Sequence, residues 1–203
     1  VPPATIRTIA GNLITASPAN DPITPLMALN ASVTLQSING TRRVPLKDFY
    51  TGVRKTVMQT DEMLVDISFP AMTSTQRGTF IKLALRRAQA ISIVDMAIIL
   101  DLDADSVRTA SIALGSVTPT IIHATEAENY LAGKQLTNEV IEEAARLTMN
   151  ASKPIDDIRG SAAYRREMVR VCTIRGLRSI LKGENQAGMP NDAVLLWGER
   201  TYV

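Results

Sequence analysis

The chain has 203 residues, enough for one large domain or two small ones, with 45% hydrophobic and 21% charged residues. A net charge of +2 and an aromatic content of 4% argue against a nucleic-acid-binding protein. The single cysteine, Cys172, and the single histidine, His123, leave no ligand set for zinc or an iron–sulfur cluster on this chain. No apolar run approaches the length of a membrane span, and we expect a cytoplasmic protein.

The N-terminal stretch from Ile6 to Asp21 is the most informative part of the sequence. An extended apolar start is broken by Ala10-Gly11-Asn12, where small residues tolerate unusual backbone angles, and a segment rich in hydroxyl groups follows. Backbone amides freed at such a turn could hold phosphate or ribose oxygens. The alternative is a strand, a turn and a helix start with no ligand, and the local pattern leaves both open.

The rest of the first 70 residues predicts a small unit of helix and strand. Asp21 suits the N-cap position of a helix that begins with Pro22. Asn39-Gly40 is a strong hairpin signal, and Pro70 ends a strand because proline lacks the N–H that a sheet needs. The expected elements are a helix at 22–30, strands at 32–37, 41–46 and 61–70, and one helical turn at 47–50.

A second unit is predicted at residues 79–183, after a small, polar linker at 71–78. Alternating polarity predicts an antiparallel meander, and apolar residues at helical spacing predict three helices after it. The strands are expected at 79–87, 91–103 and 107–115, the helices at 124–131, 138–149 (N-cap Thr137) and 161–181, and a tail at 184–203. The fold class predicted is α+β, with 1–70 as one lobe and 79–183 as the other.

The last helix and the loop before it contain several arginines whose positions suggest a role. We expect the helix to bury Tyr164, Met168, Val171, Cys172 and Leu177 and to turn its arginines to the opposite face. Cys172 is then a buried, inert thiol. Asp157 is expected to form an ion network with Arg159 and Arg165 at a domain or subunit boundary, while the remaining charge pairs form a solvated face.

The N-terminal stretch resembles the second flavin-contacting segment of the FAD-binding subunit of the xanthine dehydrogenase and carbon monoxide dehydrogenase family of molybdenum hydroxylases. The residues that carry this resemblance are Ala10-Gly11-Asn12, Thr15-Ala16-Ser17-Pro18 and Asp21. The family usually has Gly-Gly-Asn, so Ala10 is a departure. Alanine would be strained there if the position needed a positive φ, and harmless if it needed only a small side chain.

The second unit resembles the C-terminal domain of the same subunit, an open sheet covered by helices. The matching runs are Leu114-Gly115, Pro119, residues 124–128, residues 131–134 and the long run 154–168. The resemblance covers roughly residues 6–181. It implies that this chain contributes to FAD binding, with molybdopterin and 2Fe-2S centres on a large and a small partner subunit, and that FAD passes their electrons to NAD, a quinone or dioxygen.

The resemblance assigns a role at the flavin to eight residues of this chain, and implies no catalytic proton-transfer residue and no metal ligand. Lys82 would stabilise the negative charge that reduction places on the ring, Leu64 would pack beside the ring, and Asp21 would bind ribityl or ribose hydroxyls. The others would contact the same chain or the pyrophosphate through hydroxyl or backbone groups: Thr8, Gly11, Asn12, Thr15 and Ser17. Each of the first three also has a structural alternative, as a solvent-facing lysine, a core leucine and a helix cap.

The family's glycine-rich first flavin lobe has no counterpart in this sequence. We therefore expect the chain alone to be inactive, to hold FAD weakly or not at all, and to need that lobe as a partner. Two other functions stay open. One is an interaction module of the same fold that docks partner subunits without a flavin. The weaker one is a self-contained flavin oxidase of the vanillyl-alcohol oxidase type, which would need its own substrate base and a complete first lobe.

Overall fold

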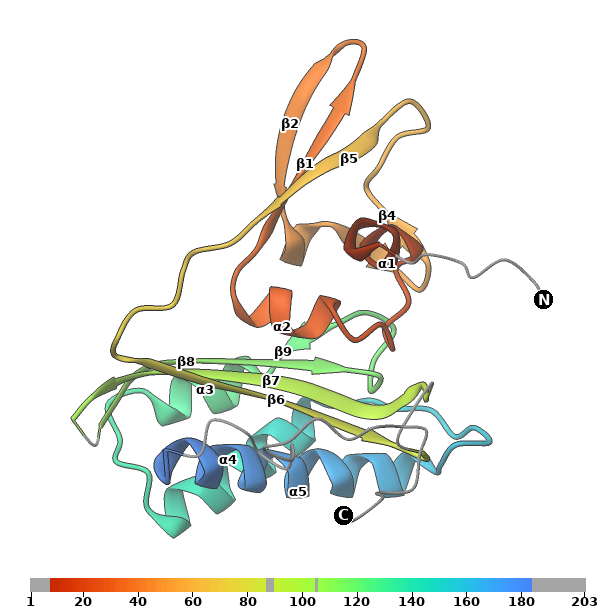
Figure 1. Ribbon diagram of the computed structural model, residues 1–203. Helices are drawn as coiled ribbons and strands as arrows, with labels where there is room; N and C mark the ends of the chain where they lie inside the picture. Colours follow the sequence, from red (N-terminus) through yellow and green to blue (C-terminus); the bar gives the residue numbers. More distant parts are fainter. Residues whose placement is uncertain (1–7, 87–89, 105, 184–203) are drawn as a thin grey trace, which may run out of the picture.

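A computed structural model describes residues 8–86, 90–104 and 106–183. The C-terminal unit contains a large sheet (Figure 1). The N-terminal unit lies on one face of this sheet, and three helices cover the other face. Predicted elements at 1–7, at 87–89 and in the tail 184–203 lie outside the described residues. Helices and strands are both present in quantity, and the α+β class is confirmed.

The N-terminal unit is built from two short helices and small antiparallel sheets. β1 pairs with β2 and β5 in the order β2-β1-β5, and the separate β3–β4 pair follows a turn of 3-10 helix. The bounds are α1 Ile9–Thr15, α2 Ile23–Ala28, β1 Ser32–Ser37, β2 Gly40–Pro45, η1 Leu46–Asp48, β3 Tyr50–Gly52, β4 Lys55–Thr56 and β5 Met63–Ser68.

The C-terminal unit is an antiparallel meander followed by helices. The strand order β6-β7-β8-β9 follows the chain, as the alternating sequence predicts. The bounds are β6 Gln76–Ala84, β7 Ser92–Asp103, β8 Ser106–Gly115, β9 Ile122–His123, α3 Thr125–Leu131, α4 Asn138–Ala151 and α5 Ala162–Leu181. The Thr137 cap is confirmed, since its hydroxyl accepts a hydrogen bond from the Val140 amide at 3.3 Å.

The central strand β7 is buried on both faces and separates two hydrophobic cores. Met96 and Ile98 point into the core shared with α3, α4 and α5, while Ala97 and Ile99 contact the core of the N-terminal unit. Side chains alternate across a strand, so a strand covered on both faces reads as a continuous apolar run. The unbroken apolar run from Met96 to Leu100 has this cause.

Several predictions at the N-terminus are wrong in informative ways. Residues 9–15 form a helix rather than a strand and turn, and the left-handed residue is Ala16 (φ 48°), so Ala10 is not strained. Asp21 does not cap α2, whose N-cap is Pro22 without a side-chain hydrogen bond. The hairpin forms, but its two turn residues are Ile38 and Asn39, since Ser37 pairs with Gly40.

The second unit departs less from expectation. β6 begins at Gln76, inside the segment predicted as a linker, and β9 is an additional short strand. On α5, Cys172 and Leu177 are buried as expected, but Tyr164 is 44% exposed. Arg165, which the sequence placed on the solvent side, is one of the largest fully buried side chains.

Arg165 joins α5 to the ends of two strands. Its guanidinium donates to the carbonyl oxygens of Ile93 (3.4 Å) and Ser116 (3.0 Å) and forms an ion pair with Asp157 at 2.5 Å. Asp157 also binds Arg159, whose hydrogen bonds are the main cause of a carboxyl pKa held well below its ordinary value. The predicted ion pairs of Asp157 with Arg159 and Arg165 are confirmed: the carboxylate bridges the two arginines, of which Arg165 is buried.

We expect Arg165→Leu to destabilise the protein by about 3–5 kcal/mol, because two carbonyls and the Asp157 carboxylate lose a buried partner. Arg166→Leu is the matched control: Arg166 is the next residue and exposed, and its replacement should change stability by no more than about 0.5 kcal/mol. Urea unfolding of both variants measures the difference. Equal stabilities would show that the buried arginine does not hold α5 to the sheet.

Candidate functional site

The Ala-Gly-Asn motif lies in α1, a two-turn helix held by its own polar side chains. Thr8 caps it, since its Oγ1 accepts from the Gly11 amide at 3.0 Å. A Cβ on Gly11 would lie 3.2 Å from that oxygen, so glycine gives the cap room to close. At the other end the Thr15 hydroxyl donates to the Asn12 carbonyl at 2.8 Å, and Ala16 ends the helix.

Asn20 ties the following loop back onto α1. Its side-chain amide donates to the Asn12 carbonyl and to Thr15 Oγ1, both at 2.7 Å. The Ser17 hydroxyl accepts from the Ala19 amide at 3.4 Å inside the same loop. These bonds fix the residue immediately before Asp21. Asn20 is not among the predicted site residues, because its only signal in the sequence is an amide side chain in a loop otherwise rich in hydroxyl groups.

Asp21 and Lys82 meet across the junction of the two units. Lys82 Nζ lies 2.5 Å from Asp21 Oδ2, and the Ser92 hydroxyl donates to Asp21 Oδ1 at 3.0 Å. Lys82 comes from β6 and Ser92 from β7, so the carboxylate is held by both strands. The side chains of Lys82 and Asp21 remain 27% and 45% exposed, which leaves both charges within reach of a ligand.

Behind this pair lies a fully buried carboxylate, Asp95. It accepts hydrogen bonds from the hydroxyls of Thr24 in α2 and of Ser116 just after β8, the latter at 2.9 Å. Burial raises the pKa of Asp95 to about 6, against the opposing effect of the two hydroxyl donors. A Cβ on Gly115 would lie 2.2 Å from Asp95 Oδ1, so only glycine fits beside it.

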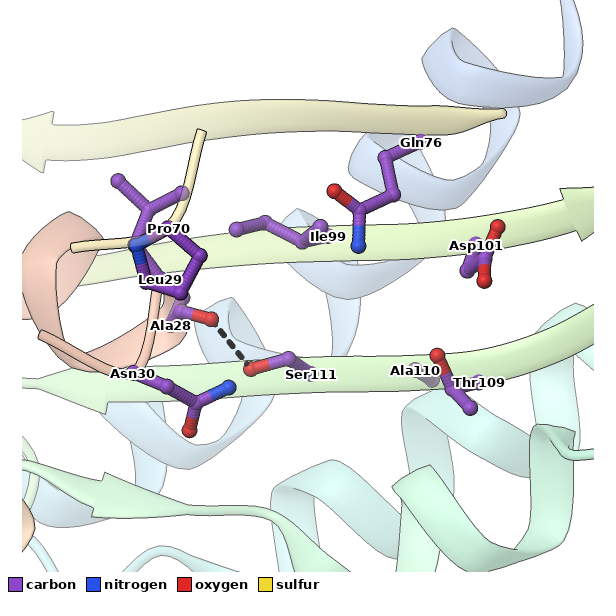
Figure 2. A pocket seen from close by; sticks show the side chains of 10 residues that line it. All are labelled: Ala28, Leu29, Asn30, Pro70, Gln76, Ile99, Asp101, Thr109, Ala110 and Ser111. Atoms are coloured by element: carbon purple, nitrogen blue, oxygen red, sulfur yellow. Dashed lines mark hydrogen bonds between the residues drawn. The ribbon is translucent and has the colours of Figure 1, made fainter. Parts of the chain in front are cut away.

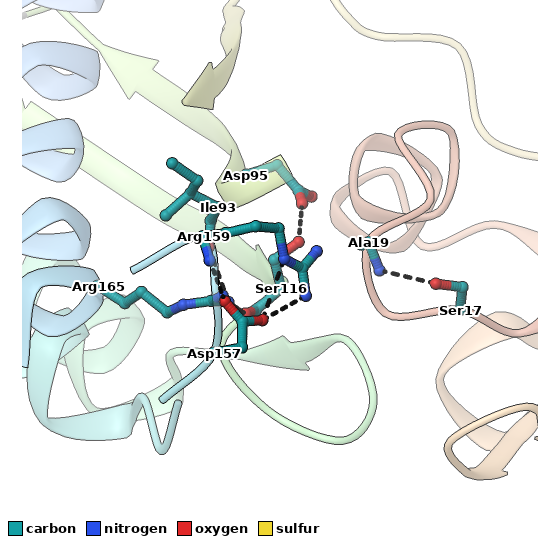
Figure 3. A network of polar contacts seen from close by, with 8 residues as sticks. All are labelled: Ser17, Ala19, Ile93, Asp95, Ser116, Asp157, Arg159 and Arg165. Carbon is teal, nitrogen blue, oxygen red and sulfur yellow. Dashed lines mark hydrogen bonds and ion pairs between the residues drawn. The ribbon is translucent and has the colours of Figure 1, made fainter. Parts of the chain in front are cut away.

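Asp95 is connected to the arginine network through Ser116 (Figure 3). The Ser116 side chain donates to Asp95, and its carbonyl accepts from Arg165, which is bound to Asp157. The segment Ser17–Ala19 lies on the other side of Asp95 in the same view. The sequence analysis assigned no role to Asp95 or Thr24, because a lone aspartate in an apolar strand gives no sign of its partners.

The structure therefore brings some of the predicted flavin residues together and leaves others apart. Asp21 and Lys82 are in direct contact, and Thr15 and Asn12 are linked to the same loop through Asn20. Thr8 and Gly11 lie at the opposite end of α1, and the Ser17 hydroxyl accepts a hydrogen bond inside its own loop. Leu64, 8% exposed on β5, belongs to the core of the N-terminal unit beside its strand partner Leu35.

A separate hollow of about 240 Å³ lies farther along the same face of the large sheet (Figure 2). It is lined by the C-terminal end of α2, by Pro70 and by residues of β6, β7 and β8, including Gln76, Ile99 and Asp101. None of the eight predicted site residues lines it. Within the described residues no cluster of histidine, cysteine and acidic side chains suits a metal ion, and no helix has the length and apolarity of a membrane span.

Comparison with known proteins assigns both units to flavoproteins of molybdenum-containing dehydrogenases. Residues 5–72 match the model of the FAD binding domain in molybdopterin dehydrogenase. Residues 79–180 match the CO dehydrogenase flavoprotein C-terminal domain. This chain belongs to that family, the FAD-binding medium subunits of the molybdenum hydroxylases.

Individual relatives agree with this assignment. The glyceraldehyde dehydrogenase medium chain of Sulfolobus acidocaldarius is 31% identical over 173 residues, covering 85% of this chain and 61% of the relative. The nicotinate dehydrogenase FAD-subunit of Eubacterium barkeri is 32% identical, covering 81% of this chain and 57% of the relative. The carbon monoxide dehydrogenase structure from Hydrogenophaga pseudoflava superposes with a TM-score of 0.81 at 30% identity, covering 85% and 60%. The chain thus spans less than two thirds of these relatives.

Asp95 makes stability depend on pH in a direction opposite to that of most aspartates. Its pKa is about 6 in the fold and 3.8 ordinarily, so the folded state holds the proton more tightly and loses stability as pH rises through this window. We expect the stability of Asp95→Asn relative to the original protein to improve by about 2 kcal/mol between pH 4 and pH 7. Urea unfolding at four pH values measures it, and a constant difference would contradict the buried charge.

Proposed function

We propose that this chain supplies one wall of an FAD site at the junction of α1, the Asp21 loop and β6. The observation that carries the proposal is the contact between Asp21 and Lys82, which lie 61 residues apart and come from the two units that match flavoprotein models. The division of the chain into lobes at 1–70 and 79–183, joined near 71–78, is part of this proposal.

The residues present fit the polar groups of FAD. A carboxylate accepts hydrogen bonds from ribityl or ribose hydroxyls, and an ammonium donates to the carbonyl and anionic oxygens of a flavin. Asp21 and Lys82 offer these groups on a partly exposed surface, and the exposed Thr15 hydroxyl is linked to the Asp21 loop through Asn20. The flavin role of Thr8, which caps the opposite end of α1, remains a prediction. The assigned roles of Gly11, Asn12, Ser17 and Leu64 remain predictions.

When bound, FAD would supply the ability to accept electrons one at a time and to release them singly or in pairs. The contribution of this chain is electrostatic: Lys82 offers positive charge where reduction makes the ring more negative, and Asp21 orients that ammonium. Electrons would arrive from molybdopterin and 2Fe-2S centres on partner subunits and leave to NAD, a quinone or dioxygen. The chain alone, without the remainder of a flavin cradle, is proposed to be inactive.

The test compares Lys82→Gln with Lys47→Gln, an exposed lysine on the 3-10 turn of the N-terminal unit, in the native assembly. We expect Lys82→Gln to bind FAD about tenfold more weakly. A charge-assisted hydrogen bond contributes about 1.5–3 kcal/mol, and the neutral glutamine amide replaces part of it. Lys47→Gln should bind FAD as the original protein does. Fluorescence quenching on titration with FAD measures both dissociation constants.

The competing function is a docking module that binds partner subunits without a flavin. A native assembly that is colourless and contains no FAD would favour it and end the proposal above. A flavin spectrum together with molybdenum and iron in the same assembly would support the electron-transfer function. Tight one-to-one binding of FAD to the isolated chain would show instead that no further flavin lobe is needed.

A further inference from the structure

Asp95 stands directly opposite Lys82 in the sheet, on the face turned to α2. The two residues are register partners in the antiparallel pair of β6 and β7, so their side chains share one face with Cβ atoms about 4.5–5.5 Å apart. Lys82 extends from there to Asp21, while Asp95 turns to Thr24 of α2. Lys82 therefore adjoins two carboxylates, the partly exposed Asp21 and the buried Asp95.

Asp95 differs from Asp21 in its surroundings. Asp95 has no exposed surface, whereas the Asp21 side chain is 45% exposed. Among the described residues, Arg165 of α5 also lies near Asp95; it reaches the Ser116 and Ile93 carbonyls and is already paired with Asp157. Within the part of the chain that the structure describes, Asp21 and Asp95 are the acidic groups that adjoin Lys82.

These three groups sum to one negative charge when Asp95 is ionised and to zero when it is protonated. We propose that Asp95 is a positioning residue of the flavin site, whose gain or loss of a proton decides how strongly Lys82 acts on the flavin. The inference rests on the function proposed above and goes beyond it, because it places the control of that site in a residue that does not touch the ligand.

The physical mechanism is a competition for the lysine charge. Ionised Asp95 attracts the ammonium and adds a negative field that opposes electron addition to a nearby ring, so it lowers the reduction potential. Protonated Asp95 removes both effects. Because burial raises the pKa of Asp95 to about 6, the change falls between mildly acidic and neutral pH.

The experiment measures the reduction potential of the bound flavin from pH 5 to pH 8 in the native assembly. Asp95→Asn should have a higher potential than the original protein at pH 8, and the two should coincide at pH 5. Asp101→Asn is the matched control, since it makes the same charge change on the same strand, about 20 Å away. It should follow the original protein at every pH.

Thr24→Val distinguishes control by a proton from mere structural support. It keeps the side-chain volume and the carboxylate but removes one hydroxyl donor to ionised Asp95, so the pH at which the potential changes should move upward. This variant also tests the proposal if Asp95→Asn does not fold. Curves that differ by a constant amount, or a transition that stays in place in Thr24→Val, would overturn the inference while leaving the flavin site intact. An original assembly without flavin would overturn both.

Discussion

The buried carboxylate of Asp95 is the group on which the junction of the two units depends. A charge without exposed surface requires hydrogen-bond donors, and here Thr24 and Ser116 supply them from α2 and from the end of β8. The same contact requires glycine at position 115, where a Cβ would collide with the carboxylate. The carboxylate thus fixes where α2 lies on the sheet, and with it the loop that carries Asp21. The Asp21–Lys82 pair depends on this placement, because its two members belong to different units.

The second constraint is that β7 belongs to two cores at once. Its even-numbered side chains from Met96 to Leu100 pack under the helices, and Ala97 and Ile99 pack under the N-terminal unit. A strand filled on both faces cannot shift along its neighbours without exposing one set of apolar side chains. The register that places Lys82 opposite Asp95 is therefore fixed by apolar packing, and the polar contacts are added to a frame that already exists.

Sequence patterns predicted the parts of this fold in which periodicity is long. The meander and the helices at 138–151 and 162–181 follow directly from apolar spacing. The sequence pattern does not predict helix α1, because seven residues that include glycine and asparagine have a weak intrinsic helix propensity. The Thr8 cap and the Asn20 amide stabilise this helix instead. The pairing of Asp21 with Lys82 could not follow from spacing alone, and the burial of Arg165 depends on carbonyls of residues far from it in sequence. The family resemblance selects Asp21 and Lys82 separately as flavin contacts, and their contact with each other is a feature that neither the motif nor any periodicity predicts.

The two carboxylates near Lys82 suit different tasks because water reaches only one of them. An ion pair at a partly exposed position contributes only about 0–1 kcal/mol to stability. Asp21 and Lys82 can therefore separate and bind ligand groups at little cost in free energy. Asp95 cannot exchange its partners in this way, since its hydroxyl donors and Gly115 enclose it. At the proposed flavin wall, Asp21 and Lys82 supply exchangeable contacts at the surface, and Asp95 behind them keeps its position while its charge changes with pH. We therefore propose the flavin wall at Asp21 and Lys82, with Asp95 behind them, rather than at the hollow beside Asp101, which none of the eight predicted site residues lines.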